Sequence, residues 1–304
     1  MTTVAIHPDH NHASAAWPTR FVLMAVLLAG AFAVTWDAWA LLFQRATQDS
    51  ESSHLTLVPL IAAWLVFVRR ERFGDLVVRS PWVGSVLMFL GIAVFFFGSQ
   101  RTMFLAYHLG AVAMISGAVL TIAGREALTK FFPAFLVLGF LTPLPPNVVN
   151  EMASPLMDIA AVATEGVLTT LSVPVERTGN LLTINGVETT VEEACAGIRG
   201  IWALTLVAVA FAFASPFKWW VRALVLLTSP LLALLCNVIR LVPTVWVYGS
   251  YSTEAADTFH DLAGWAVLFV GYMLLTGMTA LMEFVGIPIN RSNTIVSQSA
   301  EAAS

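Results

Sequence analysis

Charged residues are scarce in this chain: they make up 11% of its 304 residues, against about 25% in an ordinary soluble domain. This scarcity excludes a soluble globular enzyme. The 58% hydrophobic content excludes a disordered chain, which needs low hydrophobicity and high charge. The net charge of -4 gives no reason to expect a nucleic-acid partner. What remains is a protein that crosses a membrane several times and has membrane lipid as a partner.

Cysteine is almost lacking too, with only Cys195 and Cys236 in the chain. Two thiols allow at most one disulfide and exclude a cysteine-rich metal site. We expect no metal and no cofactor. A Cys195–Cys236 disulfide in an oxidising periplasm is the less favoured alternative, because Cys236 lies near the bilayer centre in a predicted span, where oxidising enzymes reach poorly.

Long apolar runs are what the sequence has in abundance. A spanning helix needs about 20 mostly apolar residues, with roughly 17–25 as the range. The runs predict eight helices, of which the second and fifth are short, at about 21–43, 54–68, 82–98, 103–123, 131–145, 195–213, 222–248 and 262–286. The predicted fold class is an all-α polytopic membrane protein. Residues 20–288 form its single transmembrane domain, between disordered cytoplasmic tails at 1–19 and 289–304.

The distribution of Lys and Arg over the short loops predicts the orientation, because cytoplasmic loops carry the excess. Most of the 15 cations fall on one side of the eight helices. These are Arg20, Arg69, Arg70, Arg72, Arg79, Arg125, Lys130, Lys218, Arg222 and Arg291. Both termini are therefore predicted to be cytoplasmic, which requires an even number of helices.

One predicted outer segment, 146–194, is long and rich in Asp and Glu. Residues 147–171 have the apolar stripe of an amphipathic helix that lies on the membrane surface. Residues 175–191 alternate around Thr178-Gly179-Asn180 and Asn185-Gly186, and Asn-Gly between two extended runs is a hairpin signal. We predict a small extracytoplasmic cap, consisting of one helix and one hairpin.

Cys195 begins the sixth predicted helix at its outer end. The positive end of the helix dipole favours a thiolate there, whereas the neighbouring Glu192 and Glu193 oppose it. From position alone, a reactive thiol and an inert buried thiol are equally good interpretations.

Arg240 is the stronger anomaly, because it lies well inside the seventh predicted helix. At 1.5 Å per residue it is roughly 12 Å below the outer surface, where an arginine costs at least a few kcal/mol unless it faces a cavity or a partner. Asn237 and Cys236 share its face of the helix. The alternative is a structural arginine that snorkels to the surface.

His260 is predicted at the outer end of the eighth helix, so three helices bring Cys195, Arg240 and His260 to the outer face. A thiolate nucleophile, an imidazole acid/base and a guanidinium for the oxyanion are the groups that acyl transfer needs. His54, at the outer end of the second helix, can approach the same site.

The motifs around these residues resemble those of the exosortase/archaeosortase family of integral-membrane cysteine transpeptidases, over about residues 45–285. Four pieces carry the resemblance: Ser53-His54 with Leu57-Val58-Pro59-Leu60, Trp64 and Arg69-Arg70; Glu193-Ala194-Cys195-Ala196-Gly197-Ile198; Asn237-Val238-Ile239-Arg240; and His260-Asp261-Leu262-Ala263-Gly264. The chain departs from the family pattern at Ala196, where serine is usual, and at Leu55, where glycine is usual.

The resemblance implies Cys195 as nucleophile and Arg240 and His260 as the other catalytic residues, with Asn237, Asp261 and His54 in support. It implies substrate proteins with a C-terminal sorting signal: a Pro-Glu-Pro-like motif, a helix and a basic tail. Cleavage and transfer to another anchor would link the protein to exopolysaccharide and cell-surface biogenesis. The implied location is the bacterial inner membrane, with the active site facing the periplasm.

A non-catalytic role remains the alternative hypothesis, as a membrane component of exopolysaccharide assembly or as a transporter. An intramembrane arginine beside an acidic outer segment suits a transport pathway as well. The combination of thiol, imidazole and guanidinium favours the enzyme, because a pore has no need of it.

Overall fold

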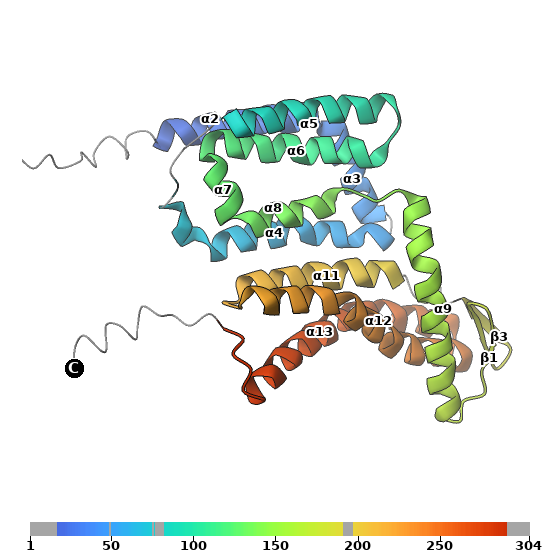
Figure 1. The fold of residues 1–304 in the computed structure, drawn as a ribbon. Helices are drawn as coiled ribbons and strands as arrows, with labels where there is room; N and C mark the ends of the chain where they lie inside the picture. Colours follow the sequence, from blue (N-terminus) through green and yellow to red (C-terminus); the bar gives the residue numbers. More distant parts are fainter. Residues whose placement is uncertain (1–16, 49, 75, 77–81, 191–196, 291–304) are drawn as a thin grey trace, which may run out of the picture. The chain divides into compact units, whose positions relative to one another are not determined.

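The computed structural model describes residues 17–48, 50–74, 76, 82–190 and 197–290 (Figure 1). Most of this part of the chain is helical. It divides into two compact units, one made of Met1–Phe43 and Arg69–Pro143, the other of Gln44–Val68 and Leu144–Ser304.

The first unit consists of apolar helices and short connecting turns. Its elements are α2 (Trp17–Val34), most of α3 (Trp36–Gln48), η2 (Arg70–Phe73), α5 (Trp82–Gln100), α6 (Phe104–Ala123), α7 (Arg125–Lys130), α8 (Phe132–Leu138) and η3 (Gly139–Leu141). Helices α5 and α6 lie side by side over their full length (Figure 1).

Glycines let α5 and α6 touch backbone to backbone. The glycines of the contact recur every seven residues on each helix: Gly84, Gly91 and Gly98 on α5, and Gly110 and Gly117 on α6. A Cβ atom at Gly84 would lie 2.1 Å from the backbone nitrogen of Thr121, and one at Gly110 would lie 2.4 Å from that of Phe95. No larger residue fits at either position without moving a helix.

The first predicted span, 21–43, is wrong as a single helix. The chain bends by 72° between Val22–Val34 and Trp36–Gln48. The buried Thr35 lies at the break, where its hydroxyl donates to the Ala31 carbonyl at 2.7 Å and accepts from Trp39 Nε1 at 2.8 Å. A threonine that bonds back to the carbonyl four residues earlier competes with the helix and bends it.

The second unit holds the longest helices and the strands. Its elements are η1 (Ser50–Thr56), α4 (Leu57–Val68), α9 (Pro146–Thr170), β1 (Glu176–Thr178), β2 (Leu181–Ile184), β3 (Val187–Thr190), α11 (Gly197–Ala214), α12 (Trp219–Ser250) and α13 (Thr253–Phe284). Helices α11, α12 and α13 pack together around a buried apolar cluster that includes Leu204, Ala233, Cys236 and Leu275.

The segment after α8 forms the predicted helix as α9, followed by an antiparallel sheet in the order β1-β2-β3. The predicted Asn185-Gly186 turn joins β2 to β3, with both residues at positive φ (+53° and +79°), as a two-residue hairpin turn requires. The structure adds β1, which a second turn at Gly179 pairs with β2. The segment is thus a helix with three strands instead of one hairpin.

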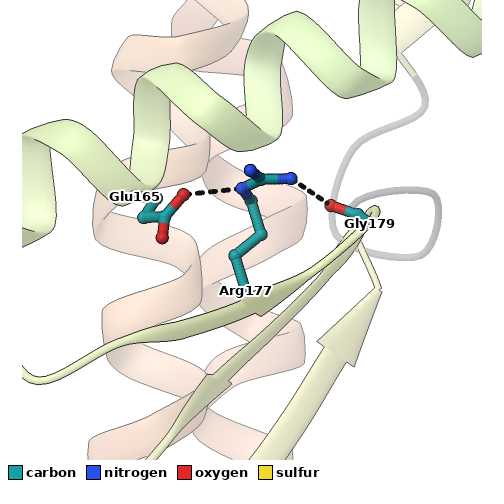
Figure 2. Close-up of polar contacts among 3 residues, drawn as sticks. All are labelled: Glu165, Arg177 and Gly179. Atoms are coloured by element: carbon teal, nitrogen blue, oxygen red, sulfur yellow. Dashed lines mark hydrogen bonds and ion pairs between the residues drawn. The ribbon is translucent and has the colours of Figure 1, made fainter.

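The sheet is fixed to its unit by an apolar face and by one arginine. Leu182 and Ile184 of β2 are buried in a cluster with residues of α9 and α12. Arg177 of β1 donates from Nε to Glu165 of α9 at 2.6 Å and from Nη1 to the Gly179 carbonyl at 3.1 Å (Figure 2).

Fewer helices are long enough to cross a membrane than the eight predicted. In the described part of the chain, four helices are long and apolar enough to cross a membrane: α5, α6, α12 and α13. The bent pair of α2 and α3 adds a fifth crossing if the two helices form one span. His54–Val68, Phe132–Leu141 and Gly200–Ala214 are apolar but shorter. At 1.5 Å per residue, about 20 residues are needed to cross a hydrocarbon core of about 30 Å.

Candidate functional site

Helix α12 carries Arg240 in its interior, as the sequence predicts. The side chain is 6% exposed, and Asn237, one turn earlier, is buried as well. Two prolines interrupt the hydrogen-bond ladder of this helix, at Pro230 and Pro243. Pro230 cannot bond the Leu226 carbonyl, and the Ser229 hydroxyl donates to that carbonyl instead, at 2.9 Å.

Polar groups of α12 itself hold Arg240. Nη2 of Arg240 is 3.5 Å from Oδ1 of Asn237, and the buried Thr244 hydroxyl donates to the Arg240 carbonyl at 2.7 Å. Burying a guanidinium costs several kcal/mol unless it is paired or faces a polar cavity. The Asn237 side-chain carbonyl gives the guanidinium one polar contact, and Arg240 also lines the cavity described below.

The guanidinium lies against α13 at Gly264. A Cβ atom built on Gly264 would lie 3.8 Å from Arg240 Nη1. Two turns nearer the α12–α13 connection, the Tyr248 hydroxyl donates to Oδ1 of Asp257 at 2.6 Å. Asp257 and Gly264 therefore mark the face of α13 that is turned to α12.

His260 lies on this same face, because it follows Asp257 by three residues and precedes Gly264 by four. The sequence placed His260 at the end of a helix, and that is wrong. Helix α13 begins at Thr253, capped by Ser252, whose hydroxyl accepts from the Ala255 amide. His260 is therefore two turns inside α13, where its side chain is half-buried. The polar first turns, which carry acidic residues, hid this start from the hydropathy pattern.

His54 reaches the site from η1, on another wall of the unit. Its ring stacks on Trp202 of α11, with the centroids 6.3 Å apart and the planes 21° from parallel. Helix α11 packs against both η1 and α4, which holds this pair in place.

These elements border a cavity of about 460 Å³. Arg240 and His54 line it together with residues of η1, α4, α11 and α13, namely Thr56, Leu57, Gly200, Ala203, Gly264, Trp265, Val267 and Leu268. Two of the predicted site residues, Arg240 and His54, thus line the same cavity. His260 lies one helical turn before Gly264, which also lines it. A fixed cation at a largely apolar cavity can stabilise an anion or a developing oxyanion, since little water screens it.

Cys195 lies outside the described residues, two positions before α11 begins. Gly200, which lines the cavity, belongs to the first turn or so of that helix. The side chain of Asp261 also lies outside the described part. Cys236 is a free, buried thiol in the apolar cluster of α11, α12 and α13, in keeping with a packing role.

Trp202 and Trp265 are site residues that the sequence did not single out. Trp202 fixes the ring of His54, and Trp265 lines the cavity. Both lie in apolar helices where an aromatic side chain is ordinary, so composition offered no signal. The neighbour of Trp265, Gly264, did belong to a quoted motif, and the structure places it at the cavity beside the Arg240 guanidinium.

One protein-family model matches the chain. The model of the transmembrane exosortase family matches residues 36–277, which include η1, α11, α12 and nearly all of α13. No curated protein and no solved structure matches the chain significantly. Because this match covers most of its length, and several of its helices are long and apolar enough to cross a membrane, the chain belongs to the transmembrane exosortase family.

Proposed function

We propose that this protein is a membrane-embedded cysteine protease and transpeptidase. Its substrates are secreted proteins that end in a sorting signal: a Pro-Glu-Pro-like motif, an apolar helix and a basic tail. The observation that carries the proposal is the buried Arg240 at a cavity of about 460 Å³, with His260 one turn from the lining residue Gly264. The cavity belongs to the unit whose helix α11 begins just after Cys195.

In the proposed reaction, the Cys195 thiolate attacks the scissile carbonyl carbon and an S–C bond forms. The carbonyl electron pair moves to oxygen, and the Arg240 guanidinium stabilises the oxyanion. His260 gives a proton to the leaving amine as the C–N bond breaks. The thioester then passes its acyl group to an acceptor, which regenerates the thiolate. No cofactor takes part in this scheme.

We further propose that the protein lies in a bacterial inner membrane with both termini in the cytoplasm and the site open to the periplasm. The loop cations support this orientation. In this arrangement the three shorter apolar segments cross the membrane with their flanking residues, for eight crossings in all, and α9 with its sheet forms the extracytoplasmic cap. A reporter fused after Arg291 should report the cytoplasm and one inserted at Asn185 the periplasm; the reverse result would contradict the orientation.

Processing of a co-expressed reporter substrate tests the function. The reporter substrate is a secreted protein that ends in a Pro-Glu-Pro motif, an apolar helix and a basic cluster. Cys195→Ala and Cys195→Ser should abolish its cleavage, because neither side chain supplies a thiolate. Cys236→Ala is the matched control and should cleave. Full cleavage by Cys195→Ala would remove Cys195 as the nucleophile, and cleavage that does not depend on this protein at all would favour the non-catalytic role in exopolysaccharide assembly or transport.

A further inference from the structure

Helix α13 carries an exposed apolar ridge that begins at the cavity. Trp265 lines the cavity and is 74% exposed, and Phe269 and Met273 follow it at intervals of four residues, with exposed fractions of 65% and 46%. Gly277 is the next residue at this spacing and is exposed as well. Residues four apart form one ridge of a helix, and a second helix packs against such ridges. These four residues, called here the α13 ridge, extend over about 18 Å.

Gly277 leaves the ridge open to close approach by another helix. In the described part of the chain, no atom lies within 4 Å of a Cβ built on Gly277, whereas a Cβ at Gly110 would meet a backbone atom at 2.4 Å. A glycine inside a helix is destabilising relative to alanine, and small residues are enriched where membrane helices pack together. An exposed glycine on an apolar ridge therefore suits contact with a helix from another chain.

Helix α12 carries an equally apolar ridge that differs in two respects. Leu227, Leu231, Leu235 and Ile239 follow one another at the same spacing and are 79%, 68%, 46% and 47% exposed. None of these four residues lines the cavity, and none of them is a glycine. Membrane lipid is sufficient to cover a ridge of this kind. An occupant that must also reach the cavity is favoured on α13, because the α13 ridge has a residue at the cavity.

We infer that the α13 ridge is the docking surface for the apolar helix of the substrate's sorting signal. In the proposed function, the cleaved motif and this helix follow each other in one chain. A substrate whose motif occupies the cavity must therefore place its helix against a surface that begins at the cavity, as the α13 ridge does with Trp265. The inference rests on the proposed function and adds to it the surface that recognises the substrate helix.

Photocrosslinking in membranes tests the docking surface without requiring cleavage. The full-length protein carries the photoreactive residue p-benzoylphenylalanine in place of Phe269 or Met273. The reporter substrate carries an epitope tag after its basic tail, so that its helix is followed whether or not it is cleaved. Both positions should crosslink to the tagged helix, and the matched positions Leu231 and Leu235 on α12 should not. Equal crosslinking from the two ridges, or none from α13, would overturn the inference, because lipid would then cover both ridges alike.

Gly277→Leu separates docking from folding. Leucine favours a helix and no described atom obstructs it, so this variant should unfold at the temperature of the wild type or above it. The added side chain should hold the substrate helix away, so the reporter concentration for half-maximal cleavage should rise by about tenfold and crosslinking from Phe269 should fall. Leu231→Ala is the control and should change neither. Unchanged crosslinking and cleavage in Gly277→Leu would overturn the inference.

The docking surface and the proposed function fail in different ways. Crosslinks from α13 to a reporter that is never cleaved would support the docking surface and contradict the protease. Cleavage of a reporter whose helix crosslinks to neither Phe269 nor Met273 would contradict the docking surface and leave the protease standing.

Discussion

The α5–α6 pair and the α11–α12–α13 group both consist of apolar helices, but the helices pack differently in the two groups. In the first, glycines bring two backbones into contact, so that even a Cβ at Gly110 would lie 2.4 Å from a backbone atom. In the second, the helices pack around an apolar cluster and also border a cavity of about 460 Å³, which the buried Arg240 lines. An atom added to a closely packed contact strains the helices around it, whereas a cavity has room for part of a substrate.

The difference teaches that apolar composition marks a membrane helix without saying what the helix does. Small residues at regular spacing indicate helix contact in a membrane, and a lone charge inside an apolar run indicates a functional site. The two units can therefore be told apart by experiment, since changes in the glycine contact should affect stability and changes at the cavity should affect turnover.

Apart from replacement of Cys195, the largest effect is expected at Arg240. Arg240→Ala should lower reporter cleavage per folded molecule by about 10²–10³-fold, or roughly 2.7–4 kcal/mol of transition-state stabilisation. Arg240→Lys keeps the charge but loses the planar fork of donors, so it should restore only part of the rate. The measurement is cleavage rate divided by folded protein from size-exclusion chromatography. Near wild-type turnover in both variants would remove Arg240 from the catalytic residues.

The next effect is expected in the glycine contact. Gly110→Ala should destabilise the protein by about 1–3 kcal/mol, because the added methyl must displace the α5 backbone at Phe95. Cleavage per folded molecule should not change. Gly166→Ala in α9 is the matched control: nothing lies within 4 Å of its Cβ, so helix propensity should stabilise it by about 0.5–1 kcal/mol. Equal thermal unfolding midpoints for the two variants would show that the α5–α6 contact is looser than described.

The sequence predicts the helices best where apolar runs coincide with helix length. The expected 82–98 and 103–123 correspond closely to α5 and α6, and the expected 147–171 to α9. The sequence does not predict the bend at Thr35, because a single threonine is common within an apolar helix. Only the structure shows that its hydroxyl bonds to the Ala31 carbonyl. The early start of α13 was missed because its first turns are polar.

The site was predicted in its parts and less well in its arrangement. The sequence indicates Arg240 because placing a charged side chain inside an apolar helix costs free energy. The structure places this residue at a cavity that His54 also lines. The contact of Trp202 with His54 joins residues far apart in the chain, and no local spacing encodes it. The roles of Cys195 and His260 stay predictions, to be decided by the experiments proposed.

A smaller effect is expected at Cys236, which sharpens the comparison within the second unit. The side chain is 3% exposed and packs in the apolar cluster of α11, α12 and α13. Cys236→Ala should lower the free energy of unfolding by about 1 kcal/mol, a typical loss for one substitution in a core. Most of the cleavage rate should remain. Denaturation midpoints and reporter cleavage measure the two. A variant as inactive as Cys195→Ala would return a two-cysteine mechanism to consideration.

The smallest effect is expected at Arg177, which links β1 to α9 (Figure 2). Arg177→Gln removes an ion pair whose side chains are 29% and 34% exposed, so solvent weakens it. The loss should be about 0.2–1 kcal/mol in thermal unfolding. Cleavage should stay unchanged, because the apolar face of β2 continues to hold the sheet. A large loss of cleavage would instead give this segment a direct part in substrate binding.

Mapping the acyl adduct tests the central claim most directly. The wild-type protein is quenched in acid during turnover of the reporter substrate, digested, and searched by mass spectrometry for a thioester-linked fragment. The proposed function predicts the adduct on the peptide that contains Cys195, none on the peptide that contains Cys236, and loss of the adduct in Cys195→Ala. Cleavage of the reporter by this protein with an adduct on another residue, or with Cys195 replaced, would contradict the account.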